Sequence, residues 1–296
     1  MRFKLDIRTL AFVFIFLIGL SILLYPVVSS TWNQYLANRL MNNYDEEIAK
    51  IEPEDLKNAL EVAKAYNESL LPKEVPDAFS IRENLFDVEY ESLLNMTGDG
   101  LMGYIEIPVI RVKSPIYHYT TEETLLKGVG HLFGSSLPVG GIGSHTVLTA
   151  HRGLPNNTLF SDLDKVVVGD KFYLNILGEV FAYQIDQIEI VEPDQTQGLA
   201  LFNEKDYATL VTCTPYGVNT HRILCRGQRI PYVPGEEDSI KRRAWVNMNI
   251  MMGLIGALLG ILVALILTIR LRRKGVVPAK PSKKKKKKTK KIIHID

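Results

Sequence analysis

The chain has 296 residues, with 35 Lys and Arg against 33 Asp and Glu, so its formal net charge at pH 7 is only +2. The balance is uneven, because residues 29–240 carry 16 basic and 31 acidic side chains, a net charge of −15. An acidic central region argues against a nucleic-acid partner and favours a basic one, such as a lysine-bearing protein.

Two uncharged apolar stretches mark the chain as a membrane protein. Residues 10–28 and 244–269 contain 19 and 26 residues without a charge. At 1.5 Å per residue, each stretch is long enough to cross ~30 Å of hydrocarbon as a helix. A cleaved signal peptide is the alternative for the first stretch, but no clear small-x-small cleavage site follows it. We therefore expect two transmembrane helices.

Basic residues next to both stretches predict the orientation. Arg2, Lys4 and Arg8 precede the first stretch, and residues 270–274 and the lysine run 283–288 follow the second. The excess of Lys and Arg places both termini in the cytoplasm and residues 29–243 outside the cell membrane. The lysine run needs no nucleic-acid partner, because anionic membrane lipids suffice to retain it.

The segment after the first stretch has helical periodicity over residues 32–50 and 54–70, and we expect these helices to lie near the membrane. Residues 71–96 have no clean period and read as a long ordered loop. A connection of that length usually has a function.

From residue 101 onward the pattern is typical of β-strands. Gly178-Glu179 reads as a two-residue hairpin loop of type II′. Seven or eight strands in about 130 residues predict a small closed barrel or a sandwich. The expected strands are residues 104–107, 109–119, 144–150, 171–177, 180–191, 208–213 and 221–232.

Cys213 ends the β-branched strand 209–212, because Pro215 stops that strand and a loop opens there. The returning strand brings Arg222 back toward the Cys213 sulfur, and a fixed cation makes a thiolate available. Taken alone, a cysteine in this position is more often an inert buried residue. Cys225 lies on the strand face opposite Arg222, so we interpret it as a core residue rather than a disulfide partner.

A cysteine nucleophile needs an acid or base within reach. Among the histidines, His151 closes the strand that His145 opens, and a strand end facing a loop suits a catalytic imidazole. His294 lies in the basic tail, and His221 shares no strand face with Arg222. No Cys/His grouping has metal-ligand spacing, so we expect neither a metal nor a cofactor. The two remaining histidines have no companion signal: His118 and His131.

Thr209-Leu210-Val211-Thr212-Cys213 fits the TLxTC motif of sortases, the transpeptidases of Gram-positive cell surfaces, and Thr149-Ala150-His151-Arg152-Gly153 resembles the sortase histidine segment. Arg222 falls where that family has its arginine. The resemblance covers about residues 100–232. It implies a mainly β fold, a closed eight-stranded barrel with N-terminal helices, with Cys213 as nucleophile, His151 as acid/base and Arg222 as stabiliser of the acyl oxyanion.

The second apolar stretch and the long loop resemble class C, the pilus-assembling sortases. In that class the loop forms a lid through an Asp-Pro-aromatic triplet, and Asp77-Ala78-Phe79 occupies a similar position. Ala78 departs from the triplet and lacks the fixed φ of proline. The resemblance implies that Asp77 pairs with Arg222 and that Phe79 lies against Cys213.

The implied reaction is cleavage of an LPxTG-like sorting signal between Thr and Gly, followed by transfer of the acyl group to a lysine of another pilin subunit, without a cofactor. Anchoring of surface proteins to peptidoglycan, a cysteine peptidase and a non-catalytic binding module are the alternatives. The expected domains are residues 1–9 (cytoplasmic), 10–28 (transmembrane), 31–70 (helical), 71–99 (lid loop), 100–232 (barrel), 244–269 (transmembrane) and 270–296 (basic tail).

Overall fold

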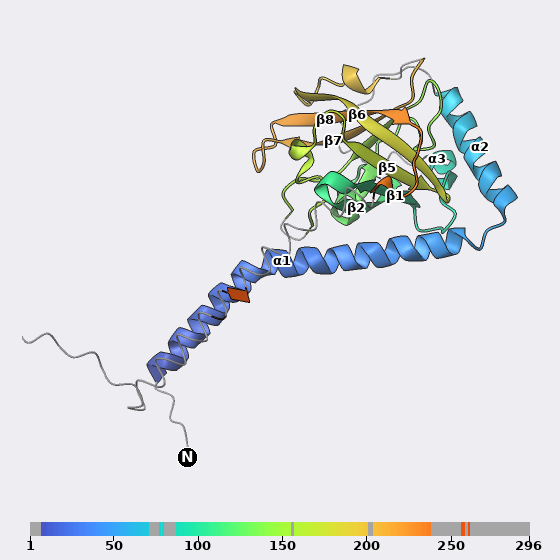
Figure 1. Cartoon of the computed structure of the whole chain (residues 1–296). Helices are drawn as coiled ribbons and strands as arrows, with labels where there is room; N and C mark the ends of the chain where they lie inside the picture. The colour runs from blue at the N-terminus through green and yellow to red at the C-terminus, as the bar shows by residue number, and fades with distance from the viewer. Residues whose placement is uncertain are drawn as a thin grey trace, which may run out of the picture. The chain divides into compact units, whose positions relative to one another are not determined.

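The structure is a computed structural model that describes residues 7–70, 77, 79, 87–154, 157–200, 204–237, and 256, 257 and 260. The chain divides into two compact units, Met1–Ala244 and Trp245–Asp296, and the helices and strands below belong to the first (Figure 1). The second expected transmembrane stretch lies almost entirely outside the described residues, and its three described positions are helical.

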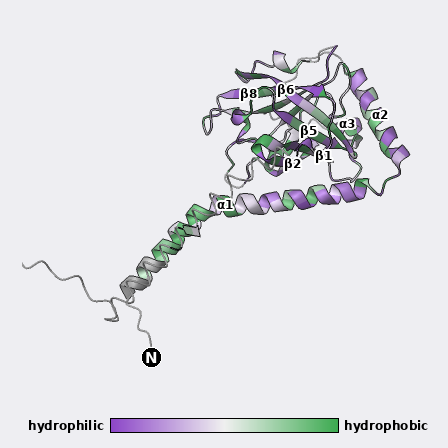
Figure 2. Ribbon diagram, viewed as in Figure 1, coloured by the Kyte–Doolittle hydropathy of each residue, from purple (hydrophilic) through white to green (hydrophobic). Residues whose placement is uncertain are grey.

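The N-terminal stretch forms part of one continuous helix, α1 (Ile7–Ile48), with Pro26 inside it. The expectation of a separate helix starting at Trp32 was therefore wrong. A proline removes one backbone hydrogen bond but need not end a helix whose other turns are intact. Figure 2 shows α1 hydrophobic in its N-terminal part and mixed beyond it. In the described part of the chain, one helix, Phe14–Ile48, is long and apolar enough to cross a membrane.

Eight strands close into a barrel in the order β1-β2-β3-β4-β7-β8-β6-β5. The pairs β2–β3 and β4–β7 are parallel and all the others are antiparallel. Closure removes free sheet edges, as the strand-rich sequence predicts. The strands are β1 (Leu101–Ile107), β2 (Val112–His118), β3 (Val129–His131), β4 (His145–Thr149), β5 (Lys171–Ile176), β6 (Glu179–Val191), β7 (Tyr207–Thr214) and β8 (His221–Ile230).

Among the described residues, two further helices precede the barrel, and a short helix and three 3-10 turns lie in the connections between its strands. Helix α3 lies inside residues 71–96, where the sequence predicts a loop. Asp87 caps this helix by accepting a hydrogen bond from the Tyr90 amide at 3.0 Å. The helices are α2 (Pro53–Ser69), α3 (Val88–Ser92) and α4 (Glu122–Lys127), with 3-10 turns η1 (Pro108–Ile110), η2 (Leu163–Lys165) and η3 (Gln197–Leu199). The turn η1 separates β1 from β2, so the strand expected over 109–119 begins three residues late.

The helices pack on the barrel through buried hydrogen bonds. Tyr44 of α1 donates to the Met102 carbonyl at 3.0 Å and accepts from the Leu177 amide at 2.9 Å. Asn67 of α2 makes two bonds to the backbone of Leu137, at 2.7 and 3.1 Å. All seven residues of β1 are buried, and α1 packs against both β1 and β2. The C-terminal part of α1 and α2 therefore belong to the folded domain.

The β5–β6 hairpin differs by one residue from the predicted turn. Ile176 pairs with Glu179, so Leu177 and Gly178 form the two-residue loop, and both have positive φ, 49° and 82°. Positive φ at both positions is the type I′ pattern rather than II′. Glycine adopts a positive φ freely at Gly178. At Leu177, the backbone amide donates a hydrogen bond to the Tyr44 hydroxyl, which holds the residue in this conformation.

Candidate active site

Strand pairing brings the candidate catalytic residues to one edge of the barrel. β4 and β7 are parallel, with Thr149 paired to Val211, so their carboxyl ends lie side by side. β7 and β8 are antiparallel, and in their register Cys213 lies directly opposite Arg222. Cross-strand partners have Cβ atoms about 4.5–5.5 Å apart. His151 follows the end of β4 by two residues and reaches the same edge.

A buried hydrogen bond ties the two chain segments together just before their functional residues. The Thr212 hydroxyl donates to the Ala150 carbonyl at 2.8 Å, and both residues are fully buried. The Ala150 amide also donates to the Val211 carbonyl, at 3.2 Å. Thr212 precedes Cys213 and Ala150 precedes His151, so these bonds fix the relative position of the thiol and the imidazole.

His151 is partly buried and lies next to an acidic side chain from α4. Its Nε2 is 3.3 Å from Oε2 of Glu122, within ion-pair distance. The same nitrogen is buried and makes no hydrogen bond to any described residue, so distance rather than hydrogen-bond geometry defines this contact. The Phe79 ring also contacts the imidazole of His151, with ring centroids 6.0 Å apart and a tilt of 33° between the ring planes.

Arg222 is bound by Asp77 through two parallel hydrogen bonds. Nε of Arg222 donates to Oδ1 of Asp77 at 2.9 Å, and Nη2 donates to Oδ2 at 2.8 Å. This bidentate geometry is the strong form of the arginine–carboxylate pair. Only 11% of the Arg222 side chain and 20% of the Asp77 side chain are exposed. The guanidinium at the candidate site therefore already has an anionic partner from the same chain.

Phe79 packs between the candidate residues and a small apolar cluster. The Arg222 guanidinium carbon lies 4.9 Å from the centroid of the Phe79 ring, a cation–π arrangement. The expectation that Phe79 also lies against Cys213 stays a prediction, because its ring contacts here are with Arg222 and His151. The cluster behind Phe79 consists of Leu132, Val147, Leu199, Val211 and Leu224.

The environment of Cys213 opposes ionisation of its thiol. Burial raises the pKa of the Cys213 thiol, Asp77 raises it further, and Arg222 acts in the opposite direction. The net effect is a raised pKa of the Cys213 thiol, because the effect of burial is larger than the opposing effect of Arg222. Asp77 also neutralises part of the positive charge of Arg222. With Asp77 in place, Cys213 is kept as a thiol rather than a reactive thiolate.

Two residues at this edge escaped the sequence analysis. Arg152 donates to the Thr214 hydroxyl at 3.0 Å and pairs with Asp164, which holds the segment after His151 against the end of β7. Glu122 is in α4, a helix that the sequence analysis did not predict. Thr121 caps α4 by accepting from the Thr124 amide, and this local signal could have located the helix.

Two other histidines, His131 and His145, and the second cysteine have structural roles. Burial lowers the pKa of His131 and of His145 to about 4 each, so both imidazoles are neutral at pH 7. Cys225 is fully buried in the core, and burial raises the pKa of its thiol to about 12. Neither cysteine is in a disulfide. Within the described ranges, no group of three or more His, Cys, Asp or Glu is placed to hold a metal ion.

Comparison with known proteins identifies the family. The Sortase domain family matches residues 105–230. The solved structure of Streptococcus pneumoniae Sortase C is 44% identical, covers 66% of this chain and 98% of its own, and superimposes with a TM-score of 0.62. The chain belongs to the sortase family. Streptococcus agalactiae Sortase C1 is similar too, with 46% identity, coverage of 66% and 95%, and a TM-score of 0.60.

Curated relatives are more distant from this sortase. Bacillus subtilis Sortase D is 33% identical over 131 residues, and Bacillus anthracis Sortase A is 28% identical over 130. The chain spans 63% and 60% of the length of these two proteins. The similarity thus covers the barrel, and the structural neighbours named above are class C sortases.

Proposed function

We propose that this sortase is a membrane-anchored transpeptidase that cleaves an LPxTG-like sorting signal between Thr and Gly and joins the acyl group to a lysine amine of another pilin subunit. The observation that carries the proposal is the position of Cys213 opposite Arg222, with His151 at the end of the neighbouring parallel strand. The pneumococcal neighbour, whose structure is described in terms of pilin substrate specificity, supports the substrate class.

In the first half-reaction, the Cys213 thiolate attacks the Thr carbonyl carbon and forms a C–S bond. Arg222 donates hydrogen bonds to the oxyanion of the tetrahedral intermediate. His151 gives a proton to the glycine nitrogen as the C–N bond breaks. The products are a thioacyl enzyme and a free amine. A thioester retains the energy of the peptide bond, so no further energy source is needed.

In the second half-reaction, a lysine amine attacks the thioacyl carbon and loses a proton to His151. The C–S bond breaks, the thiolate returns to Cys213, and an isopeptide bond remains. Water competes with the amine for the same carbon, so exclusion of water favours transfer over hydrolysis. We propose that Asp77 and Phe79 act as a lid over the site, since both contact Arg222 and Phe79 also faces His151.

The proposed membrane topology has two spans, with the barrel outside the cell and both termini in the cytoplasm. Helix α1 supports the first span by its length and hydropathy. The basic residues next to residues 10–28 and 244–269 support the orientation. In this topology the barrel has access to surface proteins and to membrane lipids.

The test uses the full chain in detergent micelles and its Cys213→Ala variant, each incubated with an LPxTG-type peptide and a lysine-bearing pilin domain. Mass spectrometry follows the thioacyl adduct and the final product. A Cys213-dependent isopeptide product is the expected result. If a product forms only when a peptidoglycan amine is added in place of the pilin domain, the acceptor is that amine and not a pilin lysine. The absence of a thioacyl adduct, even with Asp77 replaced, would contradict the proposal.

A further inference from the structure

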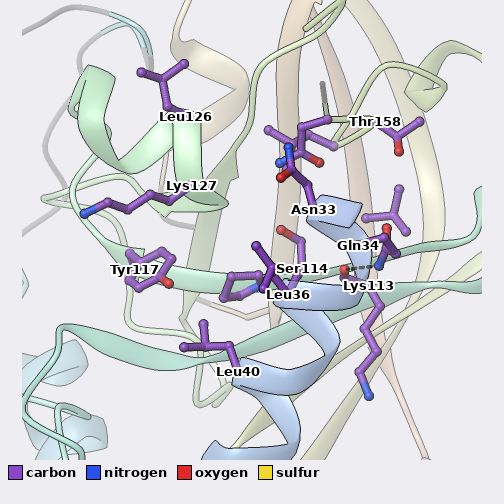
Figure 3. A pocket seen from close by; sticks show the side chains of 15 residues that line it. Asn33, Gln34, Leu36, Leu40, Lys113, Ser114, Tyr117, Leu126, Lys127 and Thr158 are labelled. Atoms are coloured by element: carbon purple, nitrogen blue, oxygen red, sulfur yellow. Dashed lines mark hydrogen bonds between the residues drawn. The ribbon is translucent and has the colours of Figure 1, made fainter. Parts of the chain in front are cut away.

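A groove of about 390 Å³ lies between α1, β2 and α4, outside the catalytic residues described above. Figure 3 shows that side chains from all three elements line it. Gln34 of α1 donates to the Lys113 carbonyl of β2 at 3.0 Å and fixes one wall. Its apolar lining includes Leu36, Leu40, Pro115, Tyr117 and Leu126. Of these, Leu36 and Leu126 are 44% and 51% exposed, so the groove presents apolar surface to solvent.

Two segments connect this groove to His151. On α4, Leu126 lines the groove and Glu122 contacts His151. These two residues are four positions apart, so they lie on the same face of the helix, one turn from each other. On the opposite wall, Thr158 lines the groove two residues before Phe160, whose amide donates to the His151 carbonyl at 3.3 Å. The groove therefore lies along the His151 side of the site.

Two lysines line the groove, Lys113 and Lys127, and their ammonium groups are paired with Glu106 and Glu123. The end of the path at Glu122 therefore suits a cation. Glu122 is 60% exposed, and none of the described Lys or Arg side chains is within ion-pair distance of it. Its neighbour Glu123 is instead paired with Lys127. One turn of helix is about 5.4 Å and a lysine side chain reaches roughly 6 Å, so a lysine with its backbone at Leu126 brings its ammonium to Glu122.

We propose that this groove, defined by Leu36, Leu40, Pro115, Tyr117 and Leu126, binds the acceptor polypeptide of the second half-reaction, and that Glu122 attracts its lysine ammonium toward His151. The inference rests on the proposed transfer to lysine and adds the place where the acceptor binds. The groove supplies apolar contacts for an extended segment, and Glu122 supplies the electrostatic attraction at its end. His151 is the base that such an amine must meet.

The experiment measures how the thioacyl enzyme partitions between two amines. Full chain carrying Asp77→Ala is loaded with an LPxTG-type peptide in micelles, then offered a lysine-bearing pilin domain together with hydroxylamine. Hydroxylamine is too small to need the groove. The ratio of isopeptide to hydroxamate product is compared among Leu126→Glu, Glu122→Gln and two controls. The controls are Ile142→Glu, which changes an 86% exposed apolar residue, and Glu179→Gln, which neutralises an exposed acid at the start of β6 that does not line the groove.

We expect the ratio to fall at least tenfold in Leu126→Glu and about threefold to fivefold in Glu122→Gln, and to stay within twofold in both controls. If isopeptide forms and neither Leu126→Glu nor Glu122→Gln lowers the ratio, the groove assignment is wrong while the proposed function stands. An equal fall in the controls would also overturn it. If the parent chain forms hydroxamate but no isopeptide, the lysine acceptor itself is wrong, and the groove proposal falls with it.

Discussion

Asp77 binds Arg222 through two hydrogen bonds of 2.9 and 2.8 Å, although the two residues are 145 positions apart in the chain. The pair places a carboxylate on the guanidinium that faces Cys213 across the β7–β8 ladder. While it is intact, Arg222 has less positive potential to offer either a thiolate or an acyl oxyanion. In the proposed mechanism, this pair therefore favours the thiol form of Cys213 and withholds Arg222 from the acyl oxyanion.

Replacing Asp77 by Ala should increase the reactivity of Cys213. The change removes the negative charge that raises the pKa of the Cys213 thiol and leaves the opposing effect of Arg222. Alkylation with iodoacetamide at pH 7, followed by mass spectrometry, should be several-fold faster than in the parent chain. Asp186→Ala is the matched control, because Asp186 makes the same bidentate pair with Arg226 on β8. Equal rates in both variants would contradict the assigned role of Asp77.

Replacing Arg222 by Lys should impair acylation even though the charge is kept. A lysine ammonium is a compact, strongly hydrated point charge and cannot make the parallel hydrogen bonds of a guanidinium. In an Asp77→Ala background, which removes the carboxylate bound to Arg222, formation of the thioacyl enzyme should slow by about 10²–10³-fold, the usual effect of losing an oxyanion donor. Arg226→Lys serves as the control. Rates within twofold of the background would exclude Arg222 from oxyanion stabilisation.

Tyr44→Phe should destabilise the folded domain without touching the candidate site. The hydroxyl of Tyr44 is buried and bonds both the Met102 carbonyl and the Leu177 amide. Its loss leaves two buried backbone groups without this partner, at a cost of about 1–3 kcal/mol in the free energy of unfolding. Tyr35→Phe, at a 57% exposed position of the same helix, should have little effect. Urea unfolding followed by far-UV circular dichroism measures the free energy of unfolding of both variants, and equal stabilities would argue that α1 is not part of the folding unit.

The stability of the domain should fall as the pH is lowered from 6.5 to 4. His131 and His145 have pKa values lowered to about 4 by burial, whereas an unfolded histidine has a pKa of about 6.5. Between these values the unfolded chain binds more protons, so their contribution is fully present above pH 6.5 and is lost toward pH 4. Each histidine changes the free energy of unfolding by up to about 1.4 kcal/mol per pH unit.

Melting temperatures of the full chain in micelles at pH 7, 6 and 5 test this dependence. Acidification also disrupts a specific contact, because the Tyr90 hydroxyl lies 2.7 Å from Nδ1 of His131 and cannot donate to a protonated nitrogen. Asp206 acts in the opposite direction, since burial raises the pKa of its carboxyl. A melting temperature that is constant or rises between pH 7 and 5 would contradict the histidine assignment.

Local sequence patterns predict the strand-rich domain, the apolar N-terminal helix and the position of Cys213 at a strand end. These features depend on short-range patterns: the β-branched run in β7, the proline after it, and an uncharged stretch in α1. The sequence also predicts that Cys225 is a core residue, since alternate residues of a strand face opposite sides. The expected Asp77–Arg222 pair came from family resemblance, as neither residue's local sequence specifies the other.

The residues that surround the candidate site depend on how distant segments pack together. Glu122 meets His151 because α4 packs against β2 and β3, and β3 pairs with the strand β4 that precedes His151. Nothing in either segment's own pattern specifies that contact. The hairpin loop shifted to Leu177-Gly178 because a hydroxyl from α1, 133 residues away, holds the Leu177 amide. Such positions depend on long-range packing and buried hydrogen bonds, which overrule local propensity when the partners are far apart in sequence.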